Sequence, residues 1–142
     1  MLRGEFESAG ELEPDALRAA YDDRLVSAIE AVGVEHAVER SGVDRAAIEA
    51  LLDGESPDIL LEDAAALLAL DENRTDAASI EAEARDILLM GMTTAVLDVE
   101  ALASEVNDAL EPKEIQQKIE GRYPMSVDEY ALIHSAIEAR TR

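Results

Sequence analysis

The sequence predicts an all-α protein with two similar units of four to five short helices each, packed together as a compact bundle. Apolar residues recur mainly at spacings of three and four, which is the period of one face of an α-helix. Three residues of segment 44–70 also recur 67 positions later in segment 111–137, namely Ile48 as Ile115, Gly54 as Gly121 and Pro57 as Pro124. A repeat at this period indicates two copies of one supersecondary unit.

The first unit is expected over residues 14–73. Pro14 suits the first position of a helix because its missing N–H is not needed there, and Gly33 and Gly54 can adopt the conformations that end helices. The expected elements are a lead helix from Pro14 to Gly33, a short helix over 35–40, a tight turn at 41–43, a third helix over 45–53 capped by Asp44, a loop at 56–58 and a last helix over 62–70.

The second unit is expected over residues 74–142. Its elements are a lead helix over 80–97, a second helix over 99–106, a turn at 107–110, a third helix from Pro112 to Gly121 and a last helix opened by the capping box at 126–129. The lead helix should bury Ile80, Ala84, Ile87, Leu88 and Leu89. Gly91 inside it costs about 1 kcal/mol relative to alanine, so we expect a kink or a close helix contact there.

The composition is that of a folded and strongly acidic protein. The 142 residues carry 33 acidic and 12 basic side chains, for a formal net charge of −21, and only two of the basic residues are lysines. The apolar periodicity argues against an acidic disordered chain. Such a composition resembles that of proteins from salt-loving archaea, where a Debye length of about 3 Å at molar salt screens the repulsion between carboxylates.

Other features limit the cellular location. The chain has no cysteine, which excludes disulfides and cysteine-ligated zinc and favours a reducing compartment. Residues 1–13 are acidic and lack an apolar run, so we expect an N-terminal tail and not a secretory signal. The longest apolar stretch, 87–97, covers about half of a bilayer. These observations predict a cytoplasmic protein with no membrane segment.

The order and spacing of the helices resemble a known family. Segment 31–70, with a small residue at Ala37, the turn Ser41-Gly42-Val43, an apolar Ile48 and Gly54 followed by Pro57, resembles the Cro/C1-type, lambda-repressor-like helix-turn-helix domain. Segment 99–121 is similar, with Asn107 and Asp108 in place of the glycine turn; both residue types tolerate left-handed geometry. The resemblance implies a DNA-binding, transcription-regulator-like protein whose third helix enters the major groove.

The resemblance places the base-contacting side chains on the third helices. Bases are read by Arg, Lys, Asn or Gln, and the third helix of the first unit offers only Arg45 among acidic residues and alanines. Both lysines and both glutamines of the chain lie between positions 113 and 118. The candidate DNA contacts are therefore Lys113, Gln116 and Gln117 toward bases, Lys118 and Arg122 toward phosphates, and Arg45. If the protein forms a homodimer, the binding free energies of two weak DNA half-sites would add.

Other interpretations stay open. The third helix of the second unit could be an ordinary surface helix with favourable pairs, such as Glu114 with Lys118. The protein could instead be a degenerate helix-turn-helix module that binds a protein partner and no DNA, or a structural protein without a defined site. His36 and His134 have no partners at metal-ligand spacing, and no nucleophile motif or phosphate loop occurs. We therefore expect no enzyme activity, no cofactor and no metal.

Overall fold

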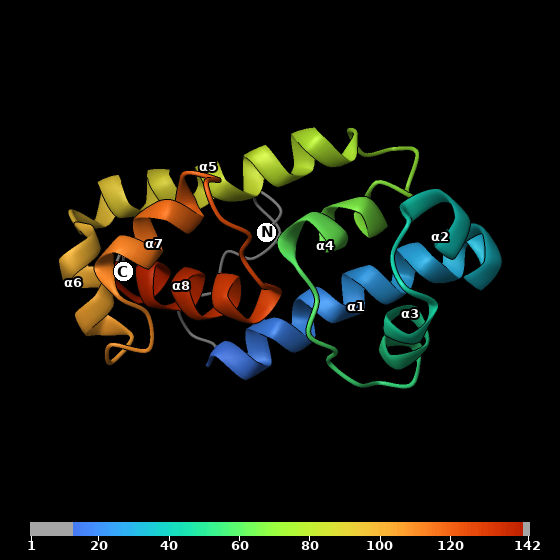
Figure 1. The fold of residues 1–142 in the computed structure, drawn as a ribbon, viewed down its shortest axis with the longest axis horizontal. Coiled ribbons are helices and arrows are strands. Elements are labelled where there is room, and N and C mark those ends of the chain that lie inside the picture. Colours follow the sequence, from blue (N-terminus) through green and yellow to red (C-terminus); the bar gives the residue numbers. More distant parts are fainter. Residues whose placement is uncertain (1–12, 141–142) are drawn as a thin grey trace.

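The computed structural model describes residues 13–140, which form α-helices without any strand (Figure 1). The all-α prediction is therefore confirmed. The helices are α1 (Pro14–Val32), α2 (Val34–Ser41), α3 (Arg45–Leu52), α4 (Leu61–Leu68), α5 (Ala77–Ala95), α6 (Val99–Glu105), α7 (Pro112–Ile119) and α8 (Val127–Arg140). The tail expected over residues 1–13 lies, apart from Glu13, outside the described residues.

Local signals explain where most helices begin. Pro14 and Pro112 occupy the first positions of α1 and α7, as predicted. Asp98 accepts a hydrogen bond from the backbone N–H of Ala101 at 2.7 Å and caps α6. Helix α5 begins three residues earlier than predicted, because Asp76 accepts a hydrogen bond from the N–H of Ser79 at 2.8 Å. Asp44 precedes α3 but forms no such side-chain cap.

Two turns adopt the left-handed geometry expected of them. Gly42, between α2 and α3, has φ of 73°. Asn107 and Asp108, between α6 and α7, have φ of 56° and 59°. The turn after α6 thus differs from the glycine turn after α2 in residue type but also uses positive φ.

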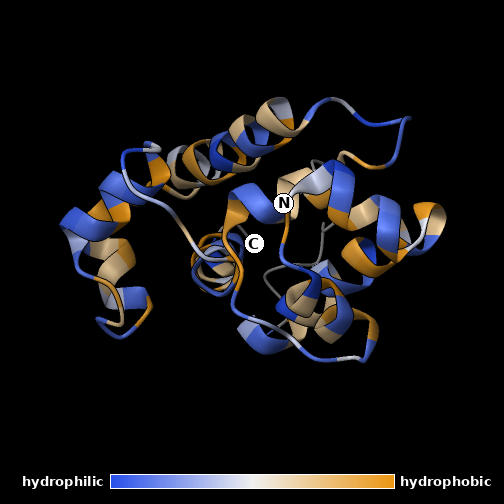
Figure 2. Cartoon of the chain, turned by 45° about the vertical axis from the view of Figure 1, so that its right-hand side comes forward, coloured by the Kyte–Doolittle hydropathy of each residue, from blue (hydrophilic) through white to orange (hydrophobic). Residues whose placement is uncertain are grey.

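The four middle helices join the two halves of the chain. Helices α1, α4, α5 and α8 lie in the centre, with α2 and α3 at one end and α6 and α7 at the other (Figure 1). Helix α1 packs along α8, and α4 packs against α5. Hydrophobic and hydrophilic residues alternate around most helices, as expected where one face covers a core (Figure 2). One cluster of buried side chains includes residues of both halves, so the boundary expected at residues 73 and 74 does not separate two cores.

A short backbone contact links the loops that precede α4 and α8. Leu61 N–H donates to the carbonyl of Met125 at 2.7 Å, and Val127 N–H donates to the carbonyl of Ile59 at 2.9 Å, on either side of an antiparallel bridge between Leu60 and Ser126. Leu60 and Ser126 occupy matching positions directly before α4 and α8. The contact therefore ties together corresponding points of the two halves.

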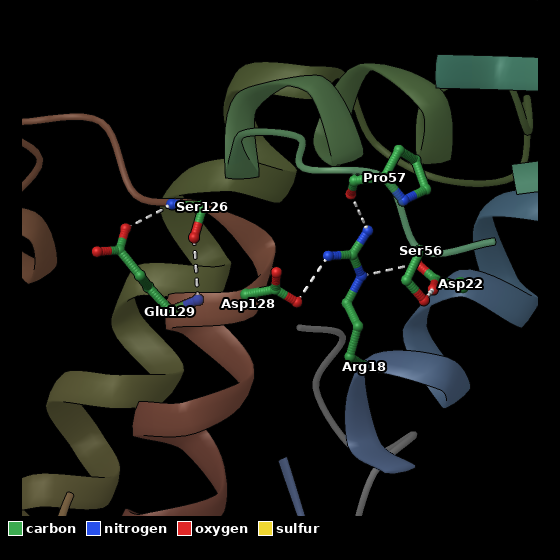
Figure 3. A network of polar contacts seen from close by, with 7 residues as sticks. All are labelled: Arg18, Asp22, Ser56, Pro57, Ser126, Asp128 and Glu129. Atoms are coloured by element: carbon green, nitrogen blue, oxygen red, sulfur yellow. Dashed lines mark hydrogen bonds and ion pairs between the residues drawn. The ribbon is translucent and has the colours of Figure 1, made fainter. Parts of the chain in front are cut away.

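A buried arginine also spans the halves (Figure 3). Arg18 on α1 donates to Asp22 at 2.9 Å, to Asp128 on α8 at 2.8 Å and to the carbonyl of Pro57 at 2.6 Å. Ser56 donates to the second carboxylate oxygen of Asp22 at 2.5 Å. Because Arg18 is 3% exposed, these partners replace the water that its guanidinium loses on folding.

Gly91 marks a close contact between α5 and α8. A Cβ atom at Gly91 would lie 2.6 Å from Cγ2 of Ile137, which is closer than carbon atoms approach. The close helix contact expected at this glycine is confirmed.

No single helix among residues 13–140 is long and apolar enough to cross a membrane. Only α5 and α6 taken together reach such a length and composition, and these two helices meet at 94°.

Candidate interaction surface around α5 and α7

Helix α7 presents the predicted DNA contacts on an amphipathic segment. Ile115 and Ile119 are buried, and Gly121 follows the helix with φ of 82°. Lys113 and Gln116 are exposed, whereas Gln117 is half-buried. Two of the three side chains expected to point toward bases thus face solvent.

Lys118 is held inside the fold. Its ammonium group pairs with Glu129 on α8, and its side chain is 17% exposed. Its carbonyl accepts a hydrogen bond from Arg85 of α5 at 3.1 Å. The sequence suggested Glu114 as a partner of Lys118, but the carboxylate of Glu114 instead accepts from the N–H of Glu111 at 3.3 Å. Lys118 therefore joins α5, α7 and α8.

Glu129 is the centre of a small network at the start of α8 (Figure 3). It accepts a hydrogen bond from the N–H of Ser126 at 2.9 Å, and the hydroxyl of Ser126 accepts from the N–H of Glu129 at 3.0 Å, which is the predicted capping box. Burial acts to raise the pKa of Glu129, but hydrogen bonds from Lys118 and Ser126 outweigh it and lower the pKa below the ordinary value. The ionised carboxylate thus holds Lys118 against α8.

Three of the other candidate residues contact carboxylates, whereas Lys113 does not do so in the segment that the structure describes. Gln116 donates to Glu120 at 3.1 Å, and Nε of Arg122 lies 3.2 Å from the other oxygen of Glu120. Arg45 donates two hydrogen bonds of 2.8 Å to Glu35, and this interaction lowers the pKa of Glu35. Lys113 has no ion pair or hydrogen bond from its side chain within residues 13–140.

The six predicted contacts do not share one surface. Five lie on α7 or directly after it, but Arg45 begins α3 at the opposite end of the molecule (Figure 1). Gln116 and Arg122 meet at Glu120, while Lys118 turns toward α8. The structure therefore does not bring the six candidate residues together.

Two hollows lie along α5, one beside α7 and the other beside the loop that follows α7. The first is apolar, has a volume of about 330 Å³ and lies between α5, the start of α6 and α7. Its apolar lining comes from Leu89, Met92, Val99 and Ile119, and its polar lining from Asp98, Gln116 and Glu120. The second is polar, has a volume of about 160 Å³ and is lined among others by Glu62, Glu81, Arg85, Arg122 and Tyr123.

Both hollows follow the same face of α5. Glu81, Arg85, Leu89 and Met92 are spaced by four, four and three residues and so lie on one side of the helix. The opposite wall is formed by residues between 116 and 125. We call this strip, from Glu81 to Met92 on α5 and from Gln116 to Met125 opposite, the α5–α7 groove.

Two of the exposed large apolar side chains line the groove. The large hydrophobic residues exposed within the described part of the chain are Leu89 at 43%, Met90 at 55%, Val96 at 89% and Tyr123 at 55%. Leu89 and Tyr123 line the groove itself, and Val96 lies in the link between α5 and α6. Val96 has φ of 55°, which is strained for a β-branched residue.

The exposure of these apolar residues was not predicted from the sequence. Leu89 was expected in the core, but Ile80, Ala84 and Leu88 define the buried side of α5 and Leu89 is exposed. A helix rotates by about 100° per residue, so the residue after the buried Leu88 turns away from the core. The i, i+4 spacing of Ile80, Ala84 and Leu88 was the signal that could have placed Leu89 outside.

Three aromatic side chains with polar, hydrogen-bonded groups lie together in the core. The hydroxyl of Tyr21 and Nδ1 of His134 share a hydrogen bond, and Tyr130 donates to the carbonyl of Ala84 at 2.8 Å. Glu138 lies 3.8 Å from Nε2 of His134, and a carboxylate nearby acts to raise the pKa of an imidazole. Burial nevertheless lowers the pKa of His134 to about 3. Burial also raises the pKa of Tyr21. All three residues are at most 3% exposed, so the cluster is closed to a ligand.

No group of three or more acidic, histidine or cysteine side chains in residues 13–140 is arranged to hold a metal ion. The sequence profile of one protein family, described as a family of unknown function (DUF5791), matches residues 17–140. The chain belongs to the DUF5791 family. This match runs from the first turn of α1 to the end of α8, so it includes the α5–α7 groove. No curated protein and no solved structure matches the chain.

Proposed function

We propose that the chain is a protein-interaction module that binds a partner protein along the α5–α7 groove. The observation that carries this proposal is that exposed Leu89 and Tyr123 each line one of two hollows on the same face of α5. Exposed apolar side chains concentrated at a concave surface are typical of sites that bind another molecule. Tyr123 and the exposed Arg122 beside it are residue types enriched among the side chains that contribute most to protein interfaces.

The electrostatics favour a protein partner over DNA. Affinity for DNA depends mainly on cations that neutralise phosphates. Here Lys118, Arg122 and Arg45 already pair with Glu129, Glu120 and Glu35. The net charge of −21 opposes a polyanion further, and the molar salt that would screen this repulsion would also weaken the remaining phosphate contacts.

DNA binding stays the second candidate function, supported by Lys113 and Gln116. Both side chains are exposed on α7, the helix that the helix-turn-helix resemblance assigns to the major groove. Under this hypothesis Lys113→Ala and Gln116→Ala should abolish any sequence preference of the chain for duplex DNA.

Site-specific photo-crosslinking in cells distinguishes the two functions. A photoreactive amino acid at position 89 or 123 should crosslink the same protein, whereas one at the exposed Ala46 on α3 should not. In parallel, the purified chain is mixed with random duplex DNA in about 2 M KCl and the bound fraction is sequenced. The protein-interaction proposal would be overturned in favour of sequence-specific DNA binding by two results together. Positions 89 and 123 would give no crosslinks, and the selection would enrich a DNA sequence that Lys113→Ala no longer enriches.

A further inference from the structure

The apolar end of the α5–α7 groove has a defined chemical character. Leu89, Met92, Val99 and Ile119 form its apolar lining over a volume of about 330 Å³. An apolar cavity of about 150 Å³ is already sufficient to hold benzene. The hollow is therefore large enough for an aromatic or branched aliphatic side chain of a partner.

The surroundings of this hollow are acidic. The charged residues that line it are Asp98 and Glu120, and no lysine or arginine contributes to the lining. Asp86 is also exposed, one helical turn before Leu89 and Met90 on α5. Arg122 is the cation that reaches Glu120, at 3.2 Å. Basic side chains next to the apolar anchor of a partner would thus meet the carboxylates of Asp98 and Asp86, and that of Glu120 beside Arg122.

The groove has the length of a short helix. Glu81 and Met92 are eleven positions apart on α5, which corresponds to about 17 Å along the helix axis. A partner helix of about three turns would span this distance. Amphipathic helices bind apolar grooves through anchor residues spaced by three and four.

We propose that the apolar hollow between α5, α6 and α7 receives the apolar anchor of a basic amphipathic helix from another protein. The inference rests on the proposed function and adds the chemistry of the partner. A second copy of this chain fits less well, because it would bring a further net charge of −21 to a rim that is already acidic. The strained and exposed Val96, in the link beside the hollow, is consistent with a binding role, since backbone strain concentrates at functional sites.

The test is an unbiased selection of peptides on the full chain. Random peptides of about fourteen residues are displayed and selected for binding in about 0.5 M KCl. The enriched peptides should have a positive net charge and an apolar residue every three or four positions. Replacing the apolar residues of a selected peptide by serine, or its basic residues by glutamate, should weaken binding about tenfold or more.

Variants of the chain locate the binding site. Asp98→Asn with Glu120→Gln removes both rim charges, and asparagine keeps the capping ability of Asp98. This double variant should weaken a selected peptide about tenfold in 0.5 M KCl and much less in 2 M KCl. Leu89→Ser should weaken it about fivefold at both salt concentrations. The matched control is Asp44→Asn with Glu49→Gln, at exposed positions directly before and on α3, which should leave binding unchanged.

Several outcomes would overturn the inference. These are the enrichment of acidic or uncharged peptides, the enrichment of no peptide, equal effects of the α3 and rim variants, and a self-association that Leu89→Ser abolishes. The charge variants keep the test valid if Leu89→Ser lowers the stability of the fold. If the in-cell crosslinks at positions 89 and 123 identify a partner whose contacting segment is acidic, this inference fails while the proposed function holds.

Discussion

Replacement of the buried Arg18 should destabilise the protein more than most other single substitutions. Arg18→Met keeps much of the aliphatic stem but removes the three hydrogen-bonded contacts to Asp22, Asp128 and the carbonyl of Pro57. Asp22 would then stay buried and keep the hydrogen bond from the hydroxyl of Ser56. Removing one partner of a buried ion pair costs about 3–5 kcal/mol, because the other charge is left uncompensated.

The two carboxylate partners of Arg18 should behave differently. The side chain of Asp22 is 10% exposed and that of Asp128 is 63% exposed. Asp128→Asn should therefore cost less than about 1 kcal/mol, as for a surface ion pair. Asp22→Asn in the Arg18→Met background should recover part of the loss, because it removes the uncompensated charge.

Urea denaturation followed by circular dichroism in about 2 M KCl measures these free energies of unfolding. Urea leaves the ionic strength constant, unlike guanidinium chloride. The reasoning is refuted if Arg18→Met costs less than about 1 kcal/mol, or if Asp128→Asn costs as much as Arg18→Met.

Three further perturbations test other parts of the fold by the same denaturation measurement. Gly91→Ala should lower the free energy of unfolding by about 1–2 kcal/mol, because the clash with Cγ2 of Ile137 exceeds the gain of about 1 kcal/mol in helix propensity. If Gly91→Ala causes an equal loss in an Ile137→Ala background, which lacks Cγ2, the close contact is contradicted. Val96→Gly should stabilise the chain by about 1 kcal/mol by relieving the positive φ, and a loss of stability would show that no strain is present. Between about pH 7.5 and about pH 5 the free energy of unfolding of the wild type should fall by about 2 kcal/mol, whereas that of the His134→Gln variant should not show this fall. The pKa of His134 is about 3 in the folded state and 6.5 unperturbed, so below pH 6.5 the unfolded state binds an additional proton and is favoured; parallel pH profiles of the two proteins would exclude this mechanism.

Local chemistry made the helices predictable. Pro14, Pro112 and the capping box at Ser126 act within one helical turn, so the sequence alone indicates where their helices begin. Asn107 and Asp108 likewise indicate a left-handed turn from residue type alone.

Contacts between distant segments were not predictable in the same way. Lys118 pairs with Glu129, eleven positions later on another helix, and Arg18 pairs with Asp128, 110 positions away. In each pair the two residues lie on different helices, so each pair depends on how α1, α7 and α8 are packed. The candidate DNA-contact site could be predicted only in part for this reason. The sequence correctly identified α7 as a helix, but whether Lys118 faces solvent depends on Glu129 of α8.

The shared core has a consequence for the chain as a whole. Helices α1 and α4 of the first half cover α8 and α5 of the second. A fragment cut at residue 73 would expose to water the apolar surfaces that now face the missing half, and it would aggregate or unfold. Neither half can therefore be exchanged, lost or transplanted alone, and mutations that accumulate on one side must be compatible with residues on the other.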